Sequence, residues 1–139
     1  MCGVLDVLDK IVNANSITYG GQNYKITTIR SNASNPVCSG QPAFAIVAES
    51  STSSDRILVS ISNFPKQATA FNINKHISYP CGNNASIFVS EISPSGSSGR
   101  IATSSGGGTC TMNFGSKQFE IKGVSLDGAG ILSGNGSFN

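Results

Sequence analysis

The sequence has few charged residues and few side chains suited to catalysis. Charged residues make up 12% of the 139 residues, about half the usual share for a soluble domain. Tryptophan is absent, and His76 is the only histidine in the sequence. The nine basic residues are scattered instead of clustered, whereas a surface that follows a phosphate backbone needs a basic patch. We therefore expect no nucleic-acid partner.

Long apolar stretches are missing as well. No run approaches the roughly 20 residues that cross a bilayer as a helix. Residues 1–6 lack the charged and apolar regions of a signal peptide. We expect a chain that either stays inside the cell or has been separated from its signal, with membrane attachment only through a lipid anchor.

No group of residues marks a catalytic or metal-binding centre. There is no G-x-S-x-G nucleophile motif to pair with His76, no C-x-x-C pair and no loop of alternating acidic ligands. The acidic residues show no pairing of the kind that glycoside hydrolysis requires; they are Asp6, Asp9, Glu49, Asp55, Glu91, Glu120 and Asp127. We therefore predict a protein that is not an enzyme and has no metal or cofactor. A small hydrolase is the third possible function, after the surface module and the virion protein described below.

Residues 4–13 have the periodicity of a short amphipathic helix. At about 100° per residue, one arc of this segment is apolar and the other is polar. Asp6 and Lys10 are four residues apart, in the orientation that stabilises a helix. We predict a helix over 4–13 that packs on the core, with oligomer contact or membrane-surface binding as alternatives.

After Asn15 the hydrophobic period changes from 3.6 to 2, which indicates strands. The Gly20-Gly21 step lies between two such runs and predicts a hairpin. Alternation places Cys110, Met112 and Phe114 on one face, and Phe119 and Ile121 on the inward face of the next run. Residues 130–138 alternate more loosely and predict a last edge strand. The pattern as a whole predicts one all-β domain over 1–139, an antiparallel β-sandwich of about 8–10 short strands, with a barrel as the alternative.

The four cysteines offer one favoured disulfide. Cys38 and Cys81 both lie in turn-rich sequence, where a bridge is geometrically easy. A Cys38–Cys81 bond would close a loop of about 43 residues and add roughly 4 kcal/mol of stability in the chain-entropy treatment. Cys110 alternates with apolar residues and is expected to be buried. The alternatives are four free thiols in a reducing compartment or a bond from Cys110 to one of the two loop cysteines.

Cys2 and several β segments resemble known surface proteins. Met1-Cys2-Gly3 resembles a mature bacterial lipoprotein, in which the first cysteine carries the lipid. Residues 17–26, 107–112, 119–124 and 131–138 resemble the opening hairpin, closing hairpin and final strand of short secreted or lipid-anchored β-sandwich domains of Bacteroidota. This resemblance implies an extracytoplasmic, non-enzymatic module. The chain departs from that pattern where a helix, instead of an acidic Asn-rich tether, follows Cys2.

The sequence therefore predicts a non-catalytic extracytoplasmic or cell-surface module that serves adhesion, binding or surface assembly. A protein partner or self-assembly is expected, and a glycan is a further candidate ligand. The alternative is a virion structural protein, such as a capsid decoration or fibre component, because such proteins are small, β-rich and made without signal peptides. In that case the helix and the strand edges would form assembly contacts.

Overall fold

The computed structural model describes residues 15–34, 42–62, 70–75 and 85–138, and these residues form strands, turns and loops without a helix. The predicted helix over 4–13 lies outside the described residues. The strands are β1 (Ser16–Tyr19), β2 (Gln22–Ser34), β3 (Pro42–Ser50), β4 (Arg56–Ser62), β5 (Ala70–Asn72), β6 (Ser86–Ile92), β7 (Ser98–Thr103), β8 (Thr109–Asn113), β9 (Gln118–Leu126) and β10 (Gly130–Ser137).

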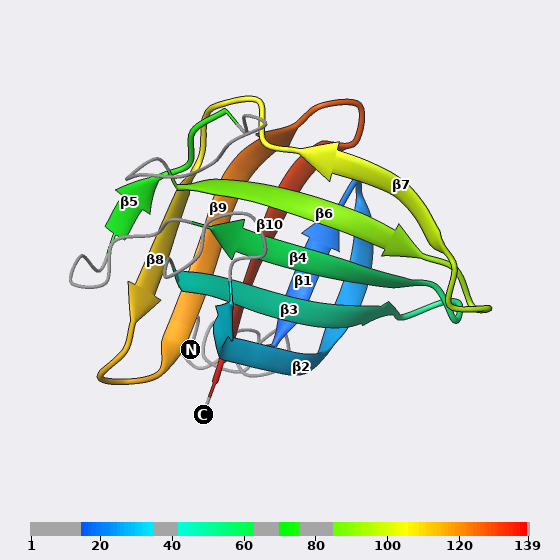
Figure 1. Cartoon of the computed structure of the whole chain (residues 1–139), viewed down its shortest axis with the longest axis horizontal. Coiled ribbons are helices and arrows are strands. Elements are labelled where there is room, and N and C mark those ends of the chain that lie inside the picture. The colour runs from blue at the N-terminus through cyan, green and yellow to red at the C-terminus, as the bar shows by residue number, and fades with distance from the viewer. Residues whose placement is uncertain (1–14, 35–41, 63–69, 76–84, 139) are drawn as a thin grey trace, which may run out of the picture.

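All ten strands belong to one continuous antiparallel sheet. The strand order is β5-β8-β9-β10-β1-β2-β3-β4-β6-β7, and the sheet curls into a half-barrel (Figure 1). Most neighbours in this order follow one another in the chain, because short turns join antiparallel strands directly. The predicted all-β antiparallel fold is confirmed, whereas the predicted two-sheet sandwich is not.

The end of β7 brings the two ends of the strand order together. Ser104, one residue beyond β7, forms an isolated bridge with Leu126 at the end of β9. The Ser105 amide donates to the Ser125 carbonyl at 3.0 Å, and the Asp127 amide donates to the Thr103 carbonyl at 2.8 Å. Strand β9 is therefore paired with β8 along its first half and with the end of β7 along its second half. This contact covers part of the edge that β7 would otherwise expose.

Gly108 allows the chain to cross from β7 to β8 close against β9. Its φ is +88°, and a Cβ atom built there would lie 2.6 Å from Val124 Cα and 2.7 Å from the Gly123 carbonyl oxygen. A side chain at this position would be strained in φ and would overlap the β9 backbone. Glycine is therefore required here by both backbone conformation and space.

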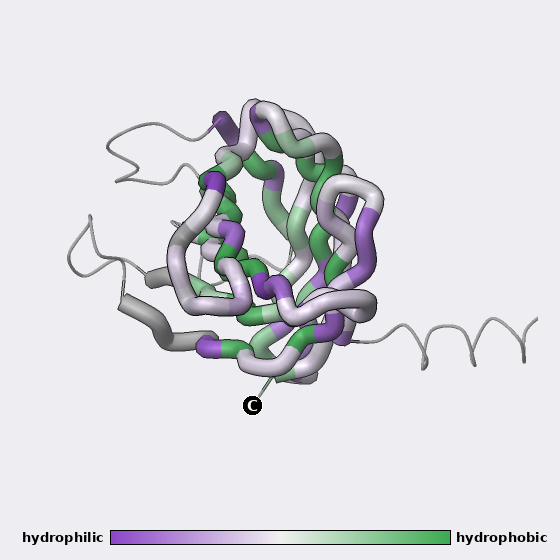
Figure 2. Tube along the Cα trace, turned by 90° about the vertical axis from the view of Figure 1, so that its right-hand side faces the viewer, coloured by the Kyte–Doolittle hydropathy of each residue, from purple (hydrophilic) through white to green (hydrophobic). Residues whose placement is uncertain are grey.

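Alternate side chains of each strand fill the inside of the curled sheet. Figure 2 shows polar and hydrophobic residues alternating along the strands, and the inward set forms one hydrophobic core. Phe44 is fully buried at its centre and packs edge-on against Phe119 and Phe138, with ring centroids 5.5 and 5.1 Å apart. These aromatic contacts join β3, β9 and the residue that follows β10 in one packed core.

The structure confirms one set of predicted buried residues and corrects two other predictions. Cys110, Met112, Phe119 and Ile121 are buried as predicted. The inward placement of Phe114 is wrong: β8 ends at Asn113, whose side-chain oxygen accepts the amides of residues 115 and 116, and Phe114 is 39% exposed in the turn. The prediction of β10 as an edge strand is also wrong, because β10 lies between β9 and β1.

Candidate functional site

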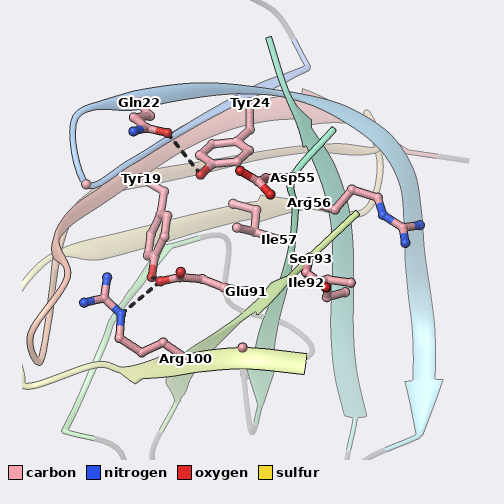
Figure 3. A pocket seen from close by; sticks show the side chains of 12 residues that line it. Tyr19, Gln22, Tyr24, Asp55, Arg56, Ile57, Glu91, Ile92, Ser93 and Arg100 are labelled. Carbon is pink, nitrogen blue, oxygen red and sulfur yellow. Dashed lines mark hydrogen bonds and ion pairs between the residues drawn. The ribbon is translucent and has the colours of Figure 1, made fainter. Parts of the chain in front are cut away.

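A polar cavity of about 360 Å³ lies at one end of the half-barrel (Figure 3). The β1–β2, β3–β4 and β6–β7 hairpins all contribute residues to it, so segments far apart in the sequence meet there. It is lined by Tyr19, Gly20, Gln22, Tyr24, Asp55, Arg56, Ile57, Glu91, Ile92, Ser93, Gly99 and Arg100. We call this space the mouth cavity.

The inward series of the strands explain why polar groups gather at the mouth cavity. In β4, the inward positions Ile61, Val59 and Ile57 are buried, and the next position of this series is Asp55. In β6, the inward residues Ile87 and Val89 are followed by Glu91. Because the side-chain period of a strand is 2, each series turns from apolar to acidic at the same end of the half-barrel.

Two tyrosines form the inner wall of the mouth cavity. Tyr19 ends β1 and Tyr24 lies in β2, on either side of a tight turn at Gly20 and Gly21, whose φ angles are +57° and +82°. Positive φ at both central residues is the conformation that glycine adopts without strain. The tyrosine side chains are only 5% and 7% exposed, and their rings meet edge-on with centroids 6.1 Å apart. Their hydroxyl groups, and not their ring faces, therefore reach the cavity.

A hydrogen-bonded network fastens the mouth of the half-barrel. The Tyr19 hydroxyl donates to Glu91 Oε2 at 2.6 Å, and Arg100 Nε donates to the same oxygen at 3.0 Å. Arg100 Nη1 also donates to the Gly128 carbonyl at 3.0 Å, in the turn between β9 and β10. The Glu91 and Arg100 side chains are 35% and 56% exposed. The network joins β1, β6 and β7 to the β9–β10 turn and holds the cavity wall in one arrangement.

The surroundings keep both phenol groups protonated. Burial raises the pKa of Tyr19 to about 12, the hydrogen bond to Glu91 adds to this shift, and Arg100 opposes it. Burial also raises the pKa of Tyr24, and the negative charges of Glu91 and Asp55 raise it further. The pKa of Arg100 is raised by its hydrogen-bond contacts with Tyr19 and Glu91. At neutral pH the cavity therefore presents two neutral hydroxyls, carboxylates and guanidinium groups.

Tyr24 is the most buried group of the mouth cavity whose hydrogen bonding is incomplete within the described residues. Its hydroxyl lies 3.5 Å from Gln22 Oε1, at the outer limit for a hydrogen bond and far beyond the usual 2.7–2.8 Å for a hydroxyl donor. Nine-tenths of the side chain is buried, and buried polar groups in folded proteins normally have a good partner. Asp55 receives one hydrogen bond on Oδ2, from Ser53 at 3.1 Å. Within the described part of the chain, a carboxylate oxygen of Asp55 and Glu91 Oε1 have no partner.

The residues singled out from the sequence lie elsewhere. Cys2, Cys38, Cys81 and His76 are outside the described residues, so the predicted lipid anchor and disulfide stay predictions. Cys110 is described and is a free, fully buried thiol whose pKa is raised to about 12, mainly by burial and further by the charge of Glu120. Across 15–34, 42–62, 70–75 and 85–138, no three His, Cys, Asp or Glu side chains are grouped to hold a metal ion.

Sequence reasoning missed the mouth cavity. It found no pairing among the acidic residues, Asp55 and Glu91 included. The signal that points to both is the extension of the inward period-2 series past the last apolar residue. What the sequence alone does not provide is the strand order, which places the ends of β4 and β6 beside the Tyr19–Tyr24 hairpin.

A second depression lies on the outer surface of β8, β9 and β10. Its volume is about 480 Å³, and it surrounds Gly136, with exposed or half-exposed polar residues such as Gln118, Glu120 and Asn135 along it. Its buried lining residues, Phe119 and Gly136, have no polar side chain, so no buried polar side chain faces it. The mouth cavity is the better candidate for a binding site.

Comparison of the chain with protein-family models, curated proteins and solved structures found no match. Among the residues the structure describes, no helix has the length and apolar character needed to cross a membrane.

Proposed function

We propose that this protein is a non-catalytic binding module and that the mouth cavity is its ligand site. The observation that carries the proposal is the Tyr24 hydroxyl, which faces the cavity and has no short hydrogen bond within the described residues, although nine-tenths of the residue is buried. A ligand that forms a hydrogen bond with this hydroxyl gains about 0.5–1.5 kcal/mol on binding.

The wall of the mouth cavity is preorganised for a ligand. Tyr19, Glu91 and Arg100 are already fixed by hydrogen bonds of 2.6 and 3.0 Å, so binding does not have to order them. A site whose side chains keep their geometry loses less conformational entropy on binding than a flexible one. Glu91 Oε1 and one oxygen of Asp55, which accept no hydrogen bond from the described residues, add acceptors next to Tyr24.

The use of the carboxylates supports binding over catalysis. Glycoside hydrolysis needs one carboxyl group as a proton donor and a second as a nucleophile or base. Glu91 instead serves as an acceptor, since Oε2 receives hydrogen bonds from both Tyr19 and Arg100. A hydrolytic role would show as turnover of a chromogenic glycoside that a Glu91→Gln variant loses, and we expect no such turnover.

The proposal also covers the location of the module and features that the described residues do not test. It places the module at the cell surface, with a lipid on Cys2 and a Cys38–Cys81 disulfide. It also includes the helix over 4–13 and a sandwich-like packing of the domain. The intact mass of the protein from its native source, measured with and without reductant, tests the first three. A lipid adduct on the Cys2 peptide and a gain of two hydrogens on reduction are expected. A bare chain with four free thiols would contradict the surface location.

The binding proposal is tested by ligand-observed NMR with a library of small polar molecules. We compare the wild type with Tyr24→Phe, which removes the cavity hydroxyl and keeps the ring. Gln118→Ala, in the depression on β8–β10, is the matched control. Saturable binding that Tyr24→Phe weakens and Gln118→Ala leaves unchanged supports the mouth cavity as the site. Binding that only Gln118→Ala weakens would place the site on the outer surface instead.

One observation favours the alternative of an assembly component, including a virion protein. Val47, Leu58, Ser90 and Ile101 are register partners across β3, β4, β6 and β7 and form an uncharged row. Ile101 is 61% exposed at the end of this row. If the row is an assembly contact, sedimentation will show concentration-dependent association that Ile101→Lys abolishes. A monomer at all concentrations would exclude self-assembly through this surface.

A further inference from the structure

We infer that the mouth cavity selects a neutral polyhydroxylated ligand, of which a sugar ring is the common form. This inference rests on the proposed function, because it names the ligand class of the same site. It follows from the charges around the cavity and from the donors and acceptors that the described residues leave unused.

Charges of both signs line the mouth cavity. Glu91 is bonded to Arg100 at 3.0 Å, and Asp55 adds a second acidic group. Figure 3 shows Asp55 beside Tyr24, whereas the Arg56 guanidinium points away from both residues. A cationic ligand would meet the guanidinium of Arg100 next to Glu91, and an anionic ligand would meet two carboxylates. A ligand of either charge would therefore lie close to a like charge, which a neutral ligand avoids.

The unused polar atoms include both acceptors and donors. The acceptors are Glu91 Oε1 and one oxygen of Asp55, each without a partner in the described part of the chain. Arg100 Nη2 is the third nitrogen of a guanidinium whose other two are bonded, and the Tyr24 hydroxyl has only its 3.5 Å contact. A ligand hydroxyl can donate to a carboxylate and accept from a guanidinium or a phenol at the same time. An ammonium group can only donate, and a carboxylate can only accept.

The tyrosines recognise the ligand through their hydroxyls. Their rings pack edge-on against each other and are more than nine-tenths buried, so no flat aromatic platform is offered for stacking. Removal of one hydroxyl from the cavity should therefore weaken binding clearly. The loss expected for a single neutral hydrogen bond is about five-fold in affinity.

The test is titration calorimetry with probes of three charge classes. The neutral probes are the methyl glycosides of glucose, galactose, mannose and N-acetylglucosamine; the charged probes are propylamine and propionate. We expect one or more glycosides to bind the wild type. Their affinity should be the same at about 20 mM and at about 500 mM salt, because salt screens interactions between charges and a neutral ligand carries none. Tyr24→Phe should lower this affinity about five-fold, and Gln118→Ala should leave it unchanged.

The outcomes separate this inference from the function on which it depends. Saturable binding of propylamine or propionate that falls with salt, without binding of any glycoside, overturns the sugar inference and leaves the binding module standing. Glycoside binding that Tyr24→Phe does not weaken also overturns the inference, because the sugar then binds elsewhere. Absence of saturable binding in the calorimetric panel and in the NMR library overturns both.

Discussion

Replacing Tyr19 with phenylalanine should destabilise the fold, whereas the same change at Tyr24 should not. Both residues belong to one hairpin and are almost equally buried, at 5% and 7% exposed. Tyr19 donates a 2.6 Å hydrogen bond to Glu91, and Tyr24 has only a 3.5 Å contact with Gln22. The pair isolates the hydrogen bond, because the ring, the burial and the chemical change are matched.

The size of the Tyr19→Phe effect follows from that hydrogen bond. A hydrogen bond to a charged group contributes about 1.5–3 kcal/mol. Glu91 is 35% exposed, so water can replace part of the lost bond, and we expect a decrease of about 1–2 kcal/mol in the free energy of unfolding. For a chain of this size that is a decrease in Tm of roughly 3–8 °C. Tyr24→Phe should change the free energy of unfolding by less than about 0.5 kcal/mol.

The loss of folding stability at alkaline pH gives an independent measure of the environment of Tyr19. The folded state raises the pKa of Tyr19 from 10.0 to about 12, so between these values the folded protein keeps a proton that the unfolded chain releases. The stabilisation is complete below pH 10 and is lost as the pH rises toward 12. The loss in Tyr19→Phe should be shallower than in the wild type. Part of it should remain, because the pKa of Tyr24 is also raised.

Urea denaturation followed by circular dichroism, at pH 7 and at several pH values up to 12, measures both quantities. If Tyr19→Phe and Tyr24→Phe unfold at the same urea concentration, the Tyr19–Glu91 bond does not stabilise the mouth as described. An unchanged loss of stability at alkaline pH in Tyr19→Phe would refute the explanation of the pKa shift.

Three further predictions concern the core and the crossing loop. Gly108→Ala should destabilise the fold by about 3 kcal/mol or more in urea unfolding, because its Cβ would lie 2.6 Å from Val124 Cα. Gly107→Ala is the control: its φ is +103° and no atom lies within 4 Å of the added Cβ, so it should lose only the roughly 1–2 kcal/mol of a positive φ. Equal losses in the two variants would contradict the steric explanation. Phe44→Ala should lose about 3–5 kcal/mol in the same assay, and Ile101→Ala, at a 61% exposed position, less than about 0.5 kcal/mol. Cys110, fully buried with a raised pKa, should resist iodoacetamide at pH 8 until the protein is unfolded, as read by peptide mass mapping; rapid labelling of the folded protein would show that β8 opens.

The fold class could be predicted from the sequence because alternation records burial directly. Cys110 and Met112, or Phe119 and Ile121, lie on one face whatever the neighbouring strand is. The position of β10 could not be predicted in this way, because its outward residues Ser133, Asn135 and Ser137 are polar and resemble those of an edge. Its central position depends on pairing with β1, far away in the sequence. Phe114 continues the alternation of β8 in the sequence, but the side chain of Asn113 ends the strand before it.

The candidate site was harder to predict than the fold, because its parts come from three hairpins. Tyr19 and Tyr24 flank a Gly-Gly turn that the sequence shows plainly. Asp55 and Glu91 extend inward series that are also visible, but an acidic residue at the end of a strand is common on protein surfaces. Only the strand order brings these residues to the same cavity as Arg100. Nothing in the sequence indicates that the Tyr24 hydroxyl lacks a short hydrogen bond.

The claim that the mouth cavity binds a ligand is tested most directly by amide chemical-shift mapping. The wild type and Tyr24→Phe are titrated with the tightest ligand of the panel, and the shifts are assigned to residues. We predict saturable shifts confined to the segments that line the cavity, at residues 19–24, 55–57 and 91–100, with weaker binding in Tyr24→Phe. Shifts that centre on β8–β10, or that are the same in both proteins, would contradict the account.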